Sequence, residues 1–380
     1  MRITLVIAGL GGGGAERVCV NLANAWVERG YQPAILTISQ HARPSVYPID
    51  ARVERRDIGW RRSARSYELN PIAIAPILRG LETARCPELI YEITLLALLR
   101  YAILATKPDV VVSKIDVTNV RVLAAMHETN VPVIVCEVTD ARRVLFRKYP
   151  RARDVLYRRA AAVVAPDPAI AEWFTARGAH AFSIANPLVP PSAQIRVQKD
   201  SRHRIVSLAR LSSEKRPELL LHAFATVADR FPSWDLELYG LGPQRNTLEH
   251  LAERLAPPNR IRICGFTDEP YEVLSRADLF VSTSWVEGFG NSIWEALACG
   301  VPVITTDAGP SVRALVRHEV DGLIVKQSGG AALADALEDL MSNETKRKSF
   351  ATRAPEVTNR FSMQAALNSW DELLALSRTR

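Results

Sequence analysis

The segment ADLFVSTSWVEGFGNSIWEALACGVPVITTDAGP, residues 277–310, decides the fold class of this chain. Residues 277–285 form a short apolar run of the kind that makes a buried parallel strand, and residues 292–299 have the composition of a helix. Residues 300–302, Gly-Val-Pro, end that helix before a second apolar strand at residues 303–305. Strand, glycine turn, helix and strand in this order predict a parallel α/β sheet.

Two acidic residues flank the glycine turn of this segment. Glu287 lies in the turn, and Glu295 lies about one turn inside the predicted helix, so both carboxylates could contact one polar ligand. The free N–H groups at a helix start and the positive end of its dipole favour a phosphate there. Carboxylates accept hydrogen bonds from the vicinal hydroxyls that a sugar nucleotide offers. For the two glutamates alone, solvated charges at a helix start are the alternative interpretation.

The whole string, from Glu287 through EALACGVPVI, resembles the donor-binding signature of retaining family 4 glycosyltransferases of GT-B fold. That resemblance implies two Rossmann-like, doubly wound parallel-sheet domains that face a cleft. It also implies that Glu287 holds the hydroxyls of the transferred sugar and Glu295 the ribose. The diphosphate and sugar would then contact the turn and helix start, formed by Gly288, Phe289, Gly290, Asn291 and Ser292.

Two cations follow a predicted strand at residues 204–211. Arg210 and Lys215 lie on the loop after this strand, and Pro217 stands near the first turn of the next helix, where its missing N–H is harmless. Cations above the carboxyl ends of parallel strands can neutralise a leaving diphosphate. An Arg and a Lys at this spacing bind the nucleotide diphosphate in the resembled family, so we predict that role for Arg210 and Lys215. A solvated loop is the alternative.

Further predicted strands of the carboxyl-terminal half end in candidate donor-binding residues. Gly240 lies at the end of the strand predicted at residues 236–240, at the edge where a parallel sheet places its ligand-binding loops. Phe266 ends the strand at residues 261–266 and resembles the nucleobase-side loop of the family. We therefore expect Gly240 and Phe266 near the donor.

The amino-terminal half opens with a predicted strand at residues 3–8 and a glycine run. Gly9, Gly11 and Gly14 satisfy the G-x-G-x-x-G pattern of dinucleotide binding. That interpretation fails because the next strand, residues 33–39, ends without the acidic residue that would bind a ribose.

The resemblance assigns the same turn differently. Gly13 and Gly14 would let the backbone approach the donor diphosphate, and Glu16 would lie on the acceptor side. Glu16 and Arg17 could equally form a surface ion pair on the first helical turn.

Polar residues also follow two buried strands predicted at residues 107–114 and 131–138. Lys114 ends the first strand, while Glu137 and Asp140 lie at the end of the second. Carboxylates at strand ends reach the ligand-binding edge of an open sheet. Glu137 and Asp140 are therefore candidates for contacting the acceptor or orienting its hydroxyl, with Lys114 beside them and Asp140 as a catalytic candidate.

Length and composition fit two domains. The chain has 380 residues, 48% of them hydrophobic and 23% charged, which suffices for two ordinary cores. The boundary is predicted at Asn186-Pro187, where a proline-rich polar segment begins. We expect an acceptor-side domain at residues 1–186 and a donor domain at residues 187–362. In the resembled family the last helix, here residues 363–380, crosses back to pack on the first domain.

The five cysteines are scattered, and the seven histidines are not paired with acids at helical spacing. We expect buried thiols in a reducing compartment, with no disulfide, no metal site and no bound cofactor. The nucleoside diphosphate sugar is expected as a substrate, with UDP favoured over GDP. The apolar run at residues 94–106 is too short to span a membrane, and no signal peptide is expected.

The formal charge of +7 is concentrated in places. Eight cations lie in one segment: Arg142, Arg143, Arg147, Lys148, Arg151, Arg153, Arg158 and Arg159. A second basic group, Arg61, Arg62 and Arg65, follows Trp60. Such residues, interleaved with apolar ones, suit an anionic membrane surface or a lipid diphosphate, and a solvated basic helix is the alternative. No nucleic-acid recognition motif is present, so nucleic acid is not an expected partner.

Together these features predict a retaining glycosyltransferase that moves a hexosyl unit from a nucleoside diphosphate sugar to the hydroxyl of a lipid-linked or polysaccharide acceptor. We expect it in the cytoplasm, peripheral at the inner face of the cell membrane. Two alternatives remain: a sugar-nucleotide epimerase of the same fold, and a non-catalytic nucleotide-binding scaffold subunit.

Overall fold

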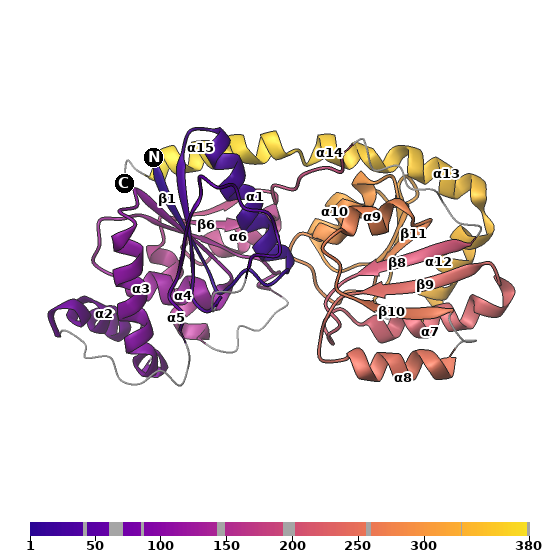
Figure 1. Cartoon of the computed structure of the whole chain (residues 1–380), viewed down its shortest axis with the longest axis horizontal. Coiled ribbons are helices and arrows are strands. Elements are labelled where there is room, and N and C mark those ends of the chain that lie inside the picture. Colours follow the sequence, from indigo (N-terminus) through magenta and orange to yellow (C-terminus); the bar gives the residue numbers. More distant parts are fainter. Residues whose placement is uncertain are drawn as a thin grey trace. The chain divides into compact units, whose positions relative to one another are not determined.

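The computed structural model describes residues 1–40, 44–60, 71–84, 87–142, 149–192, 202–255, 260–327 and 329–377. The chain divides into two compact units, one of Met1–Pro187 with Met363–Arg380 and the other of Leu188–Ser362 (Figure 1). Each unit is built on its own parallel sheet, one of seven strands and one of six. The predicted pair of doubly wound α/β domains is therefore confirmed.

The first unit has the strand order β3-β2-β1-β4-β5-β6-β7. Its strands are β1 (Arg2–Ile7), β2 (Gln32–Thr37), β3 (Glu54–Asp57), β4 (Val110–Lys114), β5 (Val133–Cys136), β6 (Ala162–Ala165) and β7 (Ala181–Ser183). Its helices are α1 (Gly14–Glu28), α2 (Pro71–Ala84), α3 (Ile93–Ala105), α4 (Asp116–Ala125), α5 (Pro150–Leu156), α6 (Pro168–Thr175) and α15 (Met363–Ser377), with the 3₁₀ turns η1 (Pro87–Glu92) and η2 (Tyr157–Arg159).

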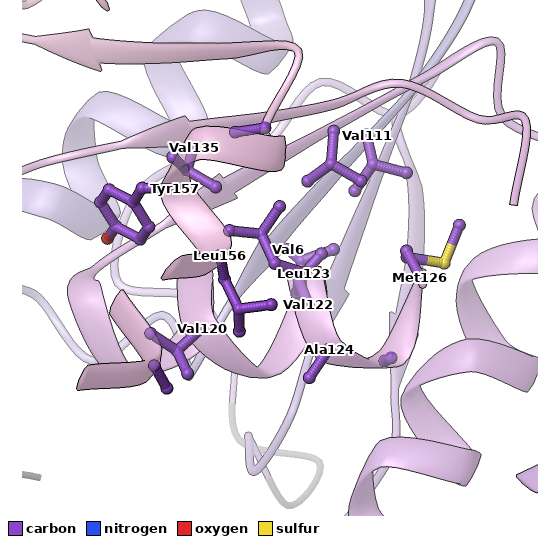
Figure 2. Close-up of a cluster of buried hydrophobic side chains, with 14 of the residues drawn as sticks. Val6, Val111, Val120, Val122, Leu123, Ala124, Met126, Val135, Leu156 and Tyr157 are labelled. Atoms are coloured by element: carbon purple, nitrogen blue, oxygen red, sulfur yellow. The ribbon is translucent and has the colours of Figure 1, made fainter. Parts of the chain in front are cut away.

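Alternating side chains of this sheet enter two different cores. Val6, Val111 and Val135 face one core, in which α4 and Leu156 also pack (Figure 2). Their strand neighbours, such as Leu5, face the other. Because both faces are covered, β1, β2, β4 and β5 read as continuous apolar runs and were predicted from the sequence, whereas β6 and β7 were not.

Strand β3 lacks this signal and was not predicted. Its sequence is Glu-Arg-Arg-Asp, all four residues are exposed, and it pairs only with β2 at the sheet edge. Charged edge strands are one way in which proteins prevent sheets from pairing edge to edge.

Helix α15 packs on the first unit although it follows the second in sequence. Trp370 meets Trp26 of α1 edge to face, with ring centres 5.5 Å apart. Asp371 accepts hydrogen bonds from Arg29 and from the Tyr31 hydroxyl, the latter at 3.0 Å. An aromatic contact and a partly buried ion pair thus attach the helix.

The second unit repeats the topology with the order β10-β9-β8-β11-β12-β13. Its strands are β8 (His203–Leu208), β9 (Trp234–Tyr239), β10 (Ile261–Gly265), β11 (Leu279–Ser282), β12 (Val303–Thr306) and β13 (Gly322–Val325). The helices are α7 (Pro217–Val227), α8 (Arg245–Leu255), α9 (Pro270–Ser275), α10 (Asn291–Ala298), α11 (Pro310–Leu315), α12 (Gly330–Ser342), α13 (Glu344–Arg353) and α14 (Val357–Arg360), with the 3₁₀ turns η3 (Ala228–Arg230) and η4 (Ala354–Glu356). In the described part of the chain, no helix combines the length and apolarity needed to cross a bilayer.

Candidate functional site

The strand order reverses beside the first strand of each sheet, between β1 and β4 in one unit and between β8 and β11 in the other. In open parallel sheets, ligands bind at the carboxyl ends of strands next to this reversal. In the second unit, the loops that follow β8 and β11 carry Arg210, Lys215 and Glu287. The described structure therefore places these predicted residues at one edge of one sheet.

Lys215 and Glu287 are in direct contact, although 72 residues separate them. The Lys215 ammonium donates to Glu287 Oε1 at 2.5 Å, and the Ser284 hydroxyl donates to the same oxygen at 2.6 Å. The two side chains are 23% and 13% exposed. Glu287 Oε2 has no hydrogen-bond partner among the described residues. One carboxylate oxygen is thus fixed by protein, and the other remains available to a ligand hydroxyl.

The loops that carry this pair are fastened to each other. The Thr283 hydroxyl contacts the carbonyl oxygens of Lys215 and Arg216 at 2.8 and 2.9 Å. The Trp285 N–H donates to the Glu214 carbonyl at 2.8 Å, and Gln327 Nε2 donates to the Trp285 carbonyl at 2.6 Å. These contacts hold the two loops in one arrangement before any ligand binds. Sequence reasoning noted the polar end of this strand but did not assign roles to Thr283 and Ser284.

The turn between Glu287 and helix α10 is shaped by packing. Gly290 caps the helix in the left-handed region, with φ of 97°, and provides no side-chain acceptor for the first-turn N–H groups. Phe289 is buried against Phe361, with ring centres 5.7 Å apart, and the Ser311 hydroxyl donates to the Gly288 carbonyl. The first turn of α10 therefore has no side-chain cap at Gly290, and N–H groups at such a helix start can receive an anion.

Glu295 lies in the second turn of α10 and is 5% exposed. It shares this helix with the uncapped N–H groups, as the sequence spacing predicts. Its predicted contact with a ribose stays a prediction.

Arg210 is exposed, and its guanidinium forms no hydrogen bond or ion pair with the residues that the structure describes. It lines an open pocket of about 550 Å³ together with Ser212, Glu214 and Leu241. Burial alone would raise the pKa of Glu214, but the Ser212 hydrogen bond and the nearby Lys215 and Arg210 hold that pKa below its usual range. The pocket wall therefore combines a free guanidinium with an ionised carboxylate.

Gly240 is required by a close backbone approach. Its φ is 151°, and a Cβ at this position would lie 1.9 Å from the Ala209 carbonyl oxygen. The glycine lets the loop after β9 pack on the loop that carries Arg210. Phe266 follows β10 and is partly exposed, which leaves its ring accessible at the same sheet edge.

In the first unit, the predicted glycine turn joins β1 to α1. Gly13 is the N-cap of α1, and the Tyr47 hydroxyl donates to the Gly12 carbonyl at 2.7 Å. Glu16 folds back over the helix start, so that a Cβ on Gly13 would lie 2.4 Å from Glu16 Oε2. Gly14 begins the helix itself.

The residues predicted at the ends of β4 and β5 are buried. Lys114 is 4% exposed, and Glu137, at 5%, accepts a hydrogen bond from the Tyr157 hydroxyl. Asn119 Nδ2 donates to the Tyr157 oxygen at 3.0 Å, so the phenol proton points to Glu137. Burial raises the pKa of Glu137 to about 7, with the Tyr157 hydrogen bond opposing it. The sequence grouped Tyr157 with the apolar residues interleaved in the basic segment and predicted no role for it beside Glu137; the structure buries it there.

Asp140 is completely buried, and both of its carboxylate oxygens bind the Arg142 guanidinium at 2.8 Å. This bidentate pair organises the loop after β5. Among the described residues of the basic segment, Pro150–Leu156 is α-helical, and Arg153 is buried beside the Trp173 ring. Arg143, Arg147 and Lys148, like Arg61, Arg62 and Arg65, lie outside the described residues.

Across the described ranges, no three His, Cys, Asp or Glu side chains gather in a way that could hold a metal ion. Cys19 and Cys136 are buried free thiols, and burial raises the pKa of both.

Comparison with known protein families finds one matching family for each of the two units. Residues 192–357 match the family of glycosyl transferases group 1, and residues 13–185 match the glycosyl transferase 4-like domain. The chain therefore belongs to the glycosyltransferases that combine these two domains.

Three of the curated relatives are named for bacterial glycan synthesis. An alpha-1,4-N-acetyl-D-galactosaminyltransferase of Campylobacter jejuni, named for a diNAcBac-PP-undecaprenol-linked substrate, is 24% identical over an alignment of 387 positions that covers 99% of this chain and 98% of the relative. The poly(glycerol-phosphate) alpha-glucosyltransferase of Bacillus subtilis is 29% identical over 188 residues, 50% of this chain and 28% of that protein. The lipopolysaccharide core glycosyltransferase LpsE of Rhizobium meliloti is 32% identical over 173 residues, 45% of this chain and 49% of its own length. The last two matches thus span between a quarter and a half of those proteins.

Solved structures show the same fold. A TarM variant of S. aureus, in complex with Fondaparinux, alpha-GlcNAc-glycerol and UDP, has a TM-score of 0.79 at 14% identity, covering 98% of this chain and 99% of that one. Anabaena HepE, in complex with UDP and glucose, has a TM-score of 0.76 at 19% identity, with coverage of 98% and 99%. The architecture of this chain is GT-B.

Proposed function

We propose that this protein is a retaining glycosyltransferase that moves a hexosyl unit from a nucleoside diphosphate sugar, with UDP favoured, to the hydroxyl of a lipid-linked or polysaccharide acceptor. The observation that carries the proposal is the Lys215–Glu287 contact beside the uncapped start of α10, at the strand reversal of the second sheet. This arrangement provides an anion site and a sugar-hydroxyl acceptor within one group of residues.

On the donor side, each residue has a distinct role. The N–H groups of Asn291 and Ser292, together with Lys215 and Arg210, would bind the diphosphate and stabilise the charge that grows on it. Glu287 would accept a hydroxyl of the transferred sugar through Oε2, since Lys215 and Ser284 occupy Oε1. Glu295 would bind the ribose.

The step itself needs no protein nucleophile. The bond from the sugar's anomeric carbon to the diphosphate oxygen breaks, and the acceptor oxygen bonds to that carbon from the same face. The acceptor proton passes to the departing phosphate oxygen, so the products are the glycoside and the nucleoside diphosphate. Lys215 and Arg210 lower the barrier because the leaving group carries more negative charge in the transition state than in the ground state.

We assign acceptor recognition to the first unit, through Glu16, Lys114, Glu137 and Asp140, while Gly13 and Gly14 of the same unit would let the backbone approach the donor diphosphate. The Campylobacter relative is named for an undecaprenol diphosphate-linked substrate and matches along nearly the whole chain. This name favours a lipid-linked acceptor and a site of action at the inner membrane surface, with contact through residues 142–159.

The test is incubation of the purified protein with UDP-sugars and GDP-sugars, with and without polyprenyl diphosphate-linked acceptors, followed by mass spectrometry. We expect hexosyl transfer that depends on the acceptor and yields an anomer of the donor's configuration. Isomerised donor without transfer would establish the epimerase alternative. Nucleotide binding without turnover would establish the scaffold alternative.

A further inference from the structure

Helix α3 of the first unit exposes apolar side chains on its outer side. Tyr101 is 76% exposed and Leu104 39% exposed. They are three residues apart and therefore lie on one helix face. The preceding turn η1 adds Ile90, 50% exposed, and Tyr91, 90% exposed. These four side chains are large, apolar or aromatic, and close in sequence.

The opposite side of α3 is just as apolar, and it is buried. Leu95, Leu99 and Ile103 are completely buried in the first core, where α3 packs against α2 and α4 (Figure 1). A helix that is apolar all round normally lies inside a core or a membrane. Burial of the inner side of α3 stabilises the fold, but it does not explain why the exposed outer side is apolar as well.

Within α3 itself, no charged side chain is left unpaired on the outer face. Arg100 is the only charged residue among the thirteen of α3. Its guanidinium donates to the carbonyl oxygens of Ala125 and His127 at 2.9 and 2.7 Å, which holds it against the end of α4. Glu92, at the start of the helix, is bound at both carboxylate oxygens by Arg121. Arg100 and Glu92 are thus both paired within the protein, and the exposed Lys107 lies two residues beyond the end of α3.

The unit that carries this face also accounts for the net positive charge of the chain. Residues 1–187 and 363–380 hold 27 Lys and Arg against 19 Asp and Glu, while the other residues hold 21 against 22. A cationic unit with an exposed aromatic and aliphatic face matches an anionic bilayer, which attracts the charge and accepts the side chains. Tyrosine in particular favours the headgroup region, where its ring can contact lipid chains while its hydroxyl stays hydrogen-bonded to water or headgroups.

We propose that the face formed by Ile90, Tyr91, Tyr101 and Leu104 enters the headgroup boundary of an anionic phospholipid bilayer and docks the first unit on it. This inference deepens the proposed function, since it names the surface that would bring the protein to a lipid-linked acceptor. It assigns insertion to α3 and η1, and it leaves to the basic residues of the unit a general attraction to the membrane.

The test is flotation of the full-length protein with vesicles of phosphatidylcholine and phosphatidylglycerol in a ratio of about 7 to 3. The variant Tyr91→Ser/Tyr101→Ser/Leu104→Ser should bind the vesicles at least about tenfold more weakly than the wild type, because apolar burial at the interface is lost. The matched control Phe182→Ser/Leu376→Ser removes two exposed apolar side chains of the same unit and should bind like the wild type. Tyr101→Trp should retain binding. Circular dichroism and the unfolding midpoint should be unchanged in all variants, since every substituted side chain is partly or largely exposed.

Equal vesicle binding by the triple variant and the wild type would overturn the proposal, as would a wild type that does not float with anionic vesicles. Sedimentation equilibrium provides a further check. A wild-type dimer that the triple variant abolishes, without any vesicle binding, would show that a second copy covers this face. Transfer to a water-soluble acceptor separates the two proposals. The triple variant should retain this transfer. Absence of transfer in the wild type would refute the enzymatic proposal and would leave the vesicle result valid.

Discussion

At the scale of single residues, Lys215 has two possible effects, because it is a cation at the proposed diphosphate site and also holds Glu287 in place. Removing it would withdraw charge stabilisation and release the carboxylate together. Ser284 binds the same carboxylate oxygen without a charge. The two side chains therefore allow the electrostatic and positioning effects to be separated.

Lys215→Ala should lower the transfer rate by about two orders of magnitude or more, the scale for losing one preorganised electrostatic contact, and should weaken nucleotide binding. Ser284→Ala should cost about tenfold or less, since Lys215 still orients Glu287. Steady-state kinetics and calorimetry with UDP would measure both effects, with Lys348→Ala on α13 as a control. Near-normal turnover by a folded Lys215→Ala protein would remove that residue from the site.

The two glutamates of the motif should differ. Glu287→Gln should mainly lower kcat, because the sugar that it touches changes charge and shape in the transition state. Glu295→Gln should mainly raise KM for the donor, since the ribose is unchanged during the reaction. Calorimetry with UDP should show reduced affinity only for the Glu295 variant. The reverse pattern would exchange the roles of the two glutamates. Unchanged kinetics in both variants would exclude both residues from the donor site.

The buried Glu137 should make stability depend on pH. Its pKa is raised from 4.5 to about 7, chiefly by burial, among Tyr157, Asp116 and Arg153. A raised carboxyl pKa means that the folded state binds the proton more tightly. The resulting stabilisation is complete below about pH 4.5 and is lost as the pH rises through about 7.

Glu137→Gln removes this titration. From pH 5 to pH 8, the free energy of unfolding of the wild type should fall relative to that of the variant by on the order of 1–3 kcal/mol, measured by urea denaturation. Glu172→Gln, an exposed acid on α6, should follow the wild type. Parallel pH profiles for wild type and Glu137→Gln would contradict the prediction.

At the scale of elements, α15 completes a core that the first 187 residues leave open. Trp370, Leu373 and Leu374 are buried together with Trp26 of α1. Trp370→Ala should lower the free energy of unfolding of this unit by about 3–5 kcal/mol, the range for deleting a large buried aromatic side chain. Leu376→Ser on the exposed side of the helix should change it by less than about 0.5 kcal/mol. Equal urea midpoints for Trp370→Ala and the wild type would show that α15 does not contribute to this core.

At the scale of the whole molecule, the donor candidates from Arg210 to Glu295 lie in one compact unit with its own hydrophobic core. A domain with its own core can in principle fold alone. The fragment 188–362 should therefore bind UDP within about tenfold of the full chain and catalyse no transfer, because the proposed acceptor residues are missing. A folded fragment that does not bind UDP in calorimetry would show that the first unit contributes essential donor contacts.

Much of this architecture could be predicted because a buried parallel strand and a surface helix have distinct apolar periods. Strands β8, β11 and β12 were recognised in this way. The parallel sheet then places Arg210, Lys215 and Glu287 at one edge, since the carboxyl ends of its strands all point the same way. Strand β3 was not predicted from the sequence, because a charged edge strand shows neither a continuous apolar run nor an apolar–polar alternation.

The sequence by itself determined the order of the elements, the Glu287–Glu295 spacing and the cations after β8, because these follow from local composition and chain direction. Only the tertiary structure decided which atoms meet. Lys215 and Ser284 share one oxygen of Glu287, Arg142 binds Asp140, and Tyr157 binds Glu137. It also decided that the outer face of α3 stays exposed. Such contacts join residues on different strands and helices, so they depend on register and packing, which local periodicity does not encode.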